Sequence, residues 1–217
     1  MLGDKPLIAY TIESGLAAKG LDKLIVSTDA VAIRNIAEEL GALVPFLRPA
    51  HLAQDDSPAL ALIQHALDFL EERGETFDAV CLLQPTTPFR PAGFIDAAIA
   101  RFVQSEADSL ISVVPVPTKY NPHWVFEPNV GGYLTLATGE ANPIPRRQEL
   151  PPAFIRDGAL YLTRVSVIRN HTLYGERISW ICDPQMIAVN IDTPSDWEEA
   201  QQQVSRYQAS LCAELPE

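Results

Sequence analysis

Residues 79–103, AVCLLQPTTPFRPAGFIDAAIARFV, decide the fold. The apolar run at 79–83 has the length of a buried strand, and a proline-rich turn separates it from an amphipathic helix predicted over 91–103. A second apolar run, at 109–114, follows that helix. Buried strands that alternate with amphipathic helices are typical of a mostly parallel sheet that helices cover on both faces. We therefore predict an α/β fold.

The same alternation extends toward the N-terminus. Helices and strands are predicted in turn at 6–16, 23–27, 33–40, 42–47 and 60–70. Asp56 or Ser57 is expected to cap the last of these helices.

Toward the C-terminus, strands at 154–163 and 187–191 precede a final helix with Thr193 as its N-cap. Residues 117–152 are rich in Pro, Gly and Asn and show no clear periodicity. They predict an irregular excursion from one domain that spans residues 1–217.

Composition narrows the class of protein. With 217 residues and 47% apolar side chains, the chain can bury one sizeable core. A net charge of −12 argues against a surface for nucleic acids or anionic membranes, which needs clustered basic residues. No stretch approaches the roughly 20 apolar residues of a membrane span, and no signal peptide is recognisable.

The three cysteines, Cys81, Cys182 and Cys212, form no CxxC pair. Cys81 lies within an apolar run, so we expect a buried, reduced thiol and a cytoplasmic protein.

Ligands of open α/β sheets bind outside the carboxyl ends of the strands, so polar residues at strand ends are the candidates for a site. They occur in the segments 27–29, 84–90, 146–148, 157–161 and 190–192. Taken singly, each also has a structural explanation: a helix cap, a rigid turn or a solvated charged face.

The sequence lacks the residue patterns of several other kinds of site. The four histidines have no metal-ligand spacing, and neither a GxSxG motif nor a Cys–His pair is recognisable. The chain also has no GxGxxG or GxxxxGK[ST] loop, and we expect the segment that holds a nucleoside triphosphate to lie upstream of Met1.

Seven segments stand in a distinctive order along the chain: KPLIAYTI at 5–12, IVSTD at 25–29, FLRP at 46–49 with Leu52, Ala53 and Asp55 after it, LLQPTTP at 82–88, RRQELPP at 146–152, DGALY at 157–161, and VNIDT at 189–193. In this order they resemble the motifs of acylneuraminate cytidylyltransferases, also called CMP-sialic acid synthetases. The resemblance covers nearly the whole chain. The N-terminal CTP-binding loop of the family has no counterpart in this sequence.

This resemblance implies a Rossmann-like nucleotide-diphospho-sugar transferase fold and a homodimer, with 117–152 as a dimerisation or substrate-lid segment. It also implies a Mg²⁺-dependent reaction of CTP with a sialic-acid-type 2-keto sugar acid, releasing pyrophosphate. Legionaminic and pseudaminic acids are close alternatives as substrates, and ketodeoxyoctonate is a further one. The alternative from another class is a non-catalytic homologue that serves as a binding or partner subunit.

The resemblance also implies roles for individual residues. Asp192 and Arg147 are the catalytic residues, and Mg²⁺ is held by Asp192 with Asn190 as a weaker ligand. The sugar acid is bound by Gln84, Thr86, Arg147, Asp157 and Tyr161, and the nucleotide by Ser27, Asp29 and Ser57. Three positions depart from the family motifs, namely Ala30 and Asn190, where the family has Asp, and Asp157, where it has Asn.

Overall fold

The computed structural model describes residues 1–54 and 56–213. They form two compact units, one made of Met1–Ser112 with Asp157–Glu217 and the other of Val113–Arg156. The excursion predicted at 117–152 lies within the second unit.

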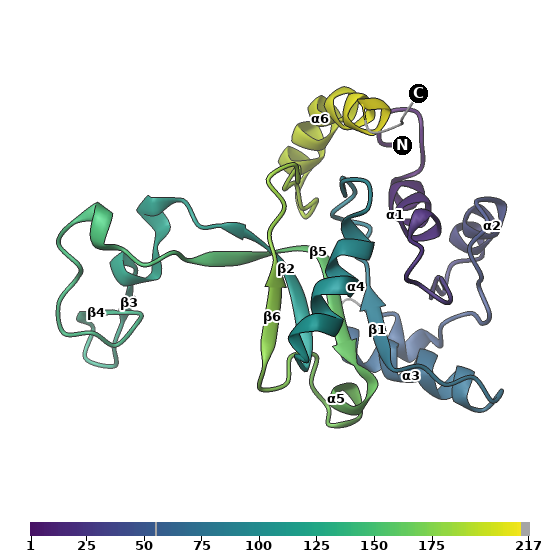
Figure 1. The fold of residues 1–217 in the computed structure, drawn as a ribbon, viewed down its shortest axis with the longest axis horizontal. Coiled ribbons are helices and arrows are strands. Elements are labelled where there is room, and N and C mark those ends of the chain that lie inside the picture. Colours follow the sequence, from purple (N-terminus) through teal and green to yellow (C-terminus); the bar gives the residue numbers. More distant parts are fainter. Residues whose placement is uncertain (55, 214–217) are drawn as a thin grey trace. The chain divides into compact units, whose positions relative to one another are not determined.

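The first unit is built on a four-stranded sheet (Figure 1). The strands are β1 (Ala79–Leu82), β2 (Ser109–Pro115), β5 (Phe154–Arg164) and β6 (Ile178–Ile181), in the order β1-β5-β2-β6. Strands β2 and β6 pair in parallel, whereas β5 runs antiparallel to β1, with Leu82 opposite Tyr161. The α/β fold and the strands predicted at 79–83, 109–114 and 154–163 are therefore confirmed.

Six α-helices accompany the sheet in the described residues: α1 (Leu7–Ala17), α2 (Val31–Glu39), α3 (Ala59–Glu71), α4 (Phe94–Ser105), α5 (Val165–Arg169) and α6 (Pro194–Ala213). Short 3₁₀ turns occupy Ala50–Leu52, Thr118–Tyr120, Pro122–Trp124 and Arg147–Glu149. None of the helices described is long and apolar enough to cross a membrane.

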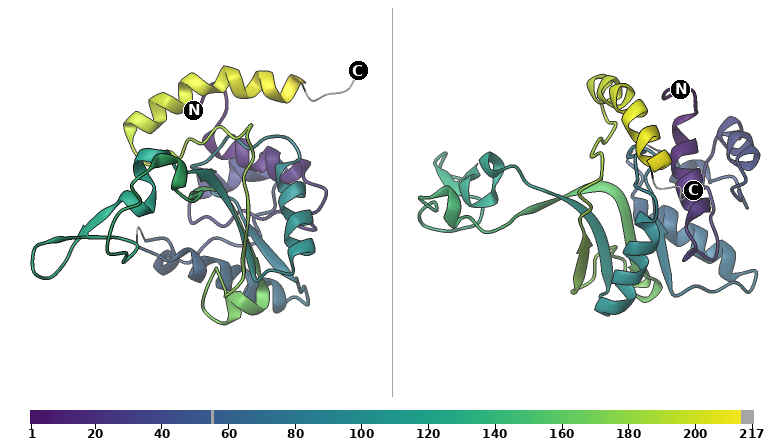
Figure 2. Two further views of the ribbon diagram at one scale, coloured as in Figure 1. Left: turned by 60° about the vertical axis from the view of Figure 1, so that its left-hand side comes forward. Right: turned by 45° about the horizontal axis from the view of Figure 1, so that its top comes forward.

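Two apolar clusters support the sheet and the turn that follows β1. The first packs α4 against the sheet, and Figure 2 shows the helix beside the strands. Its buried members include Phe94 and Phe102 on the helix and Leu110 and Leu160 on the strands. The second joins α1, α6 and the turn after β1, and its buried members include Leu2, Tyr10, Phe89, Val204 and Tyr207. The turn after β1 is therefore embedded in the core and not free at the surface.

The strands predicted at 23–27 and 42–47 are wrong in their extent. Only isolated parallel bridges join the two segments, at Ile25–Leu43 and Thr28–Leu47. Val26 N donates to Leu43 O at 2.8 Å, so backbone hydrogen bonds do join the two segments. Both segments are extended without forming a continuous ladder.

The strand predicted at 187–191 is also wrong, although Ile187 and Val189 are buried as expected of a strand. Val189 N donates to Ile187 O at 2.9 Å, a tight local turn that takes the backbone out of the sheet. The expected cap of α3 is wrong too, because its N-cap is Pro58, and Ser57 Oγ instead accepts from Gln54 N at 3.0 Å.

The second unit contains a hairpin of β3 (Phe126–Pro128) and β4 (Leu134–Leu136), which pair antiparallel. Buried Asn121 caps the turn at Pro122–Trp124 through His123 N, and its Nδ2 donates to Pro151 O at 3.0 Å. Side-chain hydrogen bonds of this kind stabilise this unit in addition to the short hairpin.

Candidate functional site

The antiparallel direction of β5 creates the site. Because Leu82 lies opposite Tyr161, the residues that follow β1 meet the residues near the beginning of β5. Gln84 follows β1 after one residue, Asp157 is half-buried, and Gly158 is the first residue of the buried stretch of β5. The segments 84–90 and 157–161, separate in the sequence, thus meet at one edge of the sheet.

Gly158 lies where these two segments meet. Its φ is +83°, and a Cβ at this position would lie 2.9 Å from Gln84 Oε1, 3.0 Å from Thr87 Oγ1 and 3.8 Å from Asn190 Oδ1. Three polar side chains therefore converge on the space that the glycine leaves open. No other residue fits this position without displacing them. We call Gln84, Thr87, Asp157, Asn190 and Asp192 the polar cluster.

Asp157 is held in one orientation. Its Oδ1 accepts hydrogen bonds from Ala159 N at 3.0 Å and from Ser112 Oγ at 2.5 Å. Its Oδ2 is buried and has no hydrogen-bond partner among the described residues. Oδ1 thus fixes the carboxylate to β2 and β5, and Oδ2 remains able to accept a hydrogen bond.

Asn190 and Asp192 join the polar cluster through the backbone and through each other. Ile191 N donates to Thr86 O at 2.8 Å, which ties this segment to the turn after β1. Thr87 Oγ1 lies 3.3 Å from Asn190 Oδ1, and Asn190 Nδ2 donates to Asp192 Oδ2 at 2.5 Å. The structure therefore brings together Gln84, Asp157, Asn190 and Asp192, four of the residues that the sequence predicts for the site.

The structural explanation of Asp192, that it caps the last helix, is not what the structure has. Thr193 and Asp196 form the cap of α6, since Asp196 N donates to Thr193 Oγ1 at 3.3 Å and Asp196 Oδ2 accepts from Thr193 N at 2.7 Å. The hydrogen bond from Thr193, followed by those from the Asp192 and Thr193 amides, lowers the pKa of Asp196. The carboxylate of Asp192 is exposed and takes no part in this cap.

The side chains of Asp192 and Asn190 are suitable ligands for Mg²⁺. This hard cation commonly takes one or two protein carboxylates and completes its shell with phosphate and water oxygens. Asp192 offers an exposed carboxylate, and Asn190 offers an amide. Asn190 turns its nitrogen toward Asp192 and its oxygen toward Thr87, so its amide must turn over to share an ion with Asp192. Within the described residues, no group of three His, Cys, Asp or Glu side chains forms a ready-made metal cage.

Ser27 and Asp29 belong to a second group, at the end of the segment 23–27. Arg48 organises it, donating from Nε to Ser27 Oγ at 3.1 Å and from Nη2 to Ser27 O. Burial lowers the pKa of Arg48, and the nearby Asp29 partly offsets this. Arg48 was not singled out from the sequence as functional, although it stands within the FLRP motif.

The other predicted residues lie elsewhere. Ser57 bonds within its own turn, and no hydrogen bond between described residues links it to Ser27 or to the polar cluster. Tyr161 is buried within β5. Arg147 is an exposed residue of the second unit.

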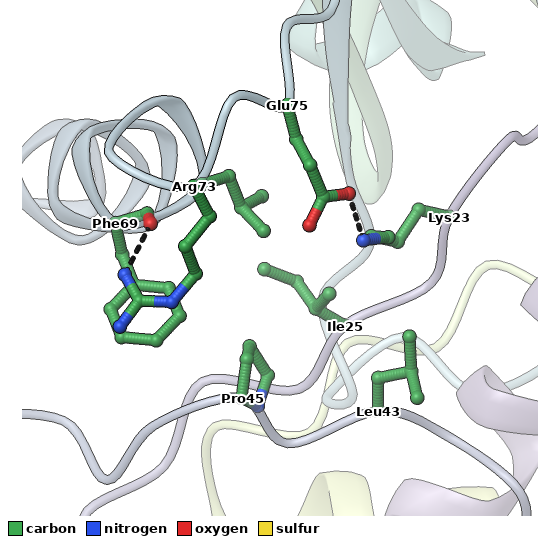
Figure 3. A pocket seen from close by; sticks show the side chains of 8 residues that line it. Lys23, Ile25, Leu43, Pro45, Phe69, Arg73 and Glu75 are labelled. Atoms are coloured by element: carbon green, nitrogen blue, oxygen red, sulfur yellow. Dashed lines mark hydrogen bonds and ion pairs between the residues drawn. The ribbon is translucent and has the colours of Figure 1, made fainter.

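One pocket of the first unit has none of the predicted site residues in its lining. A pocket of about 150 Å³ is lined by Lys23, Ile25, Leu43, Pro45, Phe69, Leu70, Arg73 and Glu75 (Figure 3). Lys23 pairs with Glu75, and the Arg73 guanidinium lies 3.4 Å from the centre of the Phe69 ring. Its charged groups already have partners, and it contains none of the predicted site residues, so we do not assign it to the site.

Comparison with known proteins gives a consistent result. The family model described as "Cytidylyltransferase" matches residues 1–208. A CMP-N,N'-diacetyllegionaminic acid synthase from Legionella pneumophila is 31% identical over 208 residues, which are 91% of this chain and 84% of that protein. A pseudaminic acid cytidylyltransferase from Campylobacter jejuni is 27% identical, over 90% of this chain and 84% of that protein. An N-acylneuraminate cytidylyltransferase from Escherichia coli is 30% identical, over 97% of this chain but 49% of that protein.

Solved structures agree on the fold. A CMP:2-keto-3-deoxy-manno-octonic acid synthetase in complex with CTP has a TM-score of 0.66 at 14% identity, covering 95% of this chain and 90% of that one. A 4-diphosphocytidyl-2C-methyl-D-erythritol synthase from Anaerococcus prevotii has a TM-score of 0.65 at 12% identity, covering 95% and 88%. At these identities the likeness concerns the fold alone, and it confirms the predicted nucleotidyltransferase architecture.

Proposed function

Because the chain belongs to the cytidylyltransferase family, we propose that it transfers CMP from CTP to the anomeric hydroxyl of a sialic-acid-like nonulosonic acid, with release of pyrophosphate. The relatives act, by their names, on legionaminic, pseudaminic and N-acylneuraminic acids. The common chemistry of these substrates is a nine-carbon 2-keto acid. We therefore propose a nine-carbon 2-keto acid as the substrate of this chain, and within that class a sialic-type acid.

The observation that carries the proposal is the exposed carboxylate of Asp192 within the polar cluster. Helix α6 has its own cap in Thr193 and Asp196, so the cap does not account for Asp192. An acidic residue at this edge of the sheet is suited to a reaction in which charge on phosphate oxygens has to be neutralised.

The chain's residues then have distinct tasks. Asp192, with Asn190, holds Mg²⁺, which when bound neutralises negative charge on the triphosphate. Gln84, Thr86 and Asp157 orient the sugar through hydrogen bonds, so that its hydroxyl faces the α-phosphate in line. Tyr161 supports the same binding site.

Arg147 binds the sugar carboxylate, because a planar guanidinium matches the geometry of a carboxylate. Ser27, Asp29 and Ser57 contact the nucleotide. The match to enzymes of this family does not favour the alternative of a non-catalytic partner subunit.

A homodimer in the cytoplasm belongs to the same proposal. The free thiols Cys81 and Cys182 support a reducing compartment, and burial raises the pKa of Cys81 to about 12, which keeps it unreactive. The second unit, with its exposed apolar hairpin, is the surface we assign to dimerisation.

The full-length gene product, incubated with CTP and MgCl₂, tests the proposal. N-acetylneuraminic, legionaminic, pseudaminic and ketodeoxyoctonic acids are offered separately, and CMP-sugar and pyrophosphate are measured by mass spectrometry and a coupled assay. We expect a CMP conjugate with at least one nine-carbon acid and none when ATP replaces CTP. Transfer to ketodeoxyoctonate alone, or to no acid, would contradict the proposal.

A further inference from the structure

A buried guanidinium joins the two sides of the polar cluster. Arg90, at the end of the turn after β1, is 1% exposed. Its Nη2 donates to Gln84 O at 2.8 Å, and its Nε donates to Ala159 O at 2.9 Å. One side chain thus connects the residue that follows β1 with the residue next to Gly158.

Arg90 carries its charge without a carboxylate in contact. Its third hydrogen bond runs from Nη1 to Thr11 Oγ1 on α1, at 3.0 Å, and it forms no ion pair within the described residues. Burial lowers its pKa to about 10, so it stays charged at neutral pH. A buried charge without an ion pair is costly to desolvate, and the three hydrogen bonds, together with the charge of Asp157, offset part of this cost. The guanidinium therefore does more than fill space, because it fixes the spacing of its three acceptors.

Helix α6 supports Arg90 from the other side. Tyr207 is buried, and its hydroxyl donates to Arg90 O at 3.0 Å. Its ring packs against Phe89, with the ring centres 5.1 Å apart. Burial raises the pKa of Tyr207 to about 12, so the hydroxyl remains a donor at neutral pH. The backbone of residue 90 is thereby held by an element that does not itself contribute to the polar cluster.

We propose that Arg90 is a positioning residue for the sugar acid. Its planar fork sets the spacing between Gln84 and the segment 157–159, and Tyr207 keeps the fork in place. Its fixed positive charge also makes the potential at this edge of the sheet more favourable for an anionic sugar. A lysine cannot replace it, because an ammonium on a flexible stem does not bind three separated acceptors in fixed directions. The proposal rests on the proposed function, which assigns Gln84 and Asp157 to the sugar acid.

Arg90→Lys in the full-length protein is the central test. It keeps a positive charge but loses the fork, and we expect the KM for the sugar acid to rise by about tenfold or more. The KM for CTP should change by less than about twofold, because Arg90 bonds to no residue assigned to the nucleotide. A purely structural role predicts a lower melting temperature with both KM values unchanged.

Two variants complete the design. Thr11→Val removes the acceptor on α1, away from the polar cluster, and should lower the melting temperature while the KM for the sugar changes by less than about twofold. Tyr207→Phe removes one hydroxyl and keeps the ring, and should raise the KM for the sugar by roughly two- to fivefold. If Arg90→Lys does not fold, Tyr207→Phe decides the question.

An unchanged KM for the sugar in the folded variants of Arg90 and Tyr207 would overturn the proposal. So would equal changes in the KM for both substrates. Calorimetric titration with the sugar acid measures the same differences without turnover. Failure of CMP transfer by the unaltered protein would instead count against the proposed function.

Discussion

The two units of the chain differ in how they use their apolar residues. The first encloses them in clusters such as the one that packs α4 on the sheet. In the second, Val113–Arg156, only Val113, Asn121 and Leu136 are buried. Its hairpin exposes Phe126, Leu134 and, in the turn between the strands, Tyr133.

The hairpin of the second unit is amphipathic. Phe126 pairs with Leu136 and Pro128 with Leu134, whereas Glu127 pairs with Thr135 between them. Side chains alternate between the faces of a strand, so one face is apolar and the other is polar. A segment of this length buries too little apolar surface to be stable without outside contacts. This difference fits our proposal that the first unit carries most of the residues for the reaction and the second unit carries the surface for dimerisation, with Arg147 as the exception.

The largest expected effect concerns the first unit. Asp192→Asn should lower kcat roughly a hundredfold or more, because it removes the carboxylate that we assign to Mg²⁺. Asn190→Asp should lower the Mg²⁺ concentration needed for half-maximal activity, since a second carboxylate attracts the ion more strongly than an amide. The measurements are initial rates over a range of Mg²⁺ concentrations.

Asp196→Asn is the matched control. It should lower the melting temperature of the protein and leave turnover largely intact, since Asp196 belongs to the cap of α6. Because the pKa of Asp196 is lowered in the folded protein, its stabilising effect should be lost as the pH falls through that pKa. Full turnover of Asp192→Asn together with a lower melting temperature would reassign Asp192 to the helix end.

The second-largest effect concerns Arg147, which belongs to the second unit although we assign it to the sugar acid. Arg147→Ala should raise the KM for the sugar acid roughly tenfold to a hundredfold, the cost of a lost charged hydrogen bond, with little change for CTP. Arg146→Ala is the control, because Arg146 is also exposed and its Nη1 forms an ion pair with Glu149 Oε1 at 3.6 Å. Equal effects on both substrates would move Arg147 to the phosphates, and no effect would leave it a solvated charge.

The smallest effect sharpens the role of the second unit. Leu134→Glu places a charge on the apolar face of the hairpin and should weaken the homodimer by about tenfold or more. Thr135→Glu, on the opposite face of the same strand, should leave assembly unchanged. Analytical ultracentrifugation distinguishes the two. An unaltered dimer in both variants would exclude this face as the interface.

Much of the fold follows from local patterns. The runs at 79–83 and 109–114 are short and mostly apolar, and both are strands in the structure, as is the longer segment 154–163. The run at 187–191 has the same appearance but folds as a turn, because Val189 bonds back to Ile187. Burial requires apolar residues in either case, so composition alone cannot distinguish the two.

Gln84, Asp157, Asn190 and Asp192 were predicted as polar residues near strand ends, and they lie together in the structure, whereas Thr87 was not singled out. Their spacing could not be predicted, because it depends on the direction of β5. An antiparallel β5 places Gly158 beside Gln84, and a parallel strand would carry it to the opposite edge of the sheet.

The sequence by itself determined the α/β class, the excursion at 117–152 and the polar residues at strand ends, because these follow from periodicity and local turn chemistry. Only the tertiary structure decided what Asp192 and Arg90 do. Asp192 is available because Asp196 caps α6 in its place. Arg90 is central because its three partners, Thr11, Gln84 and Ala159, come from different elements that packing brings within reach of one guanidinium. Such contacts depend on distances in space, which no local pattern along the chain encodes.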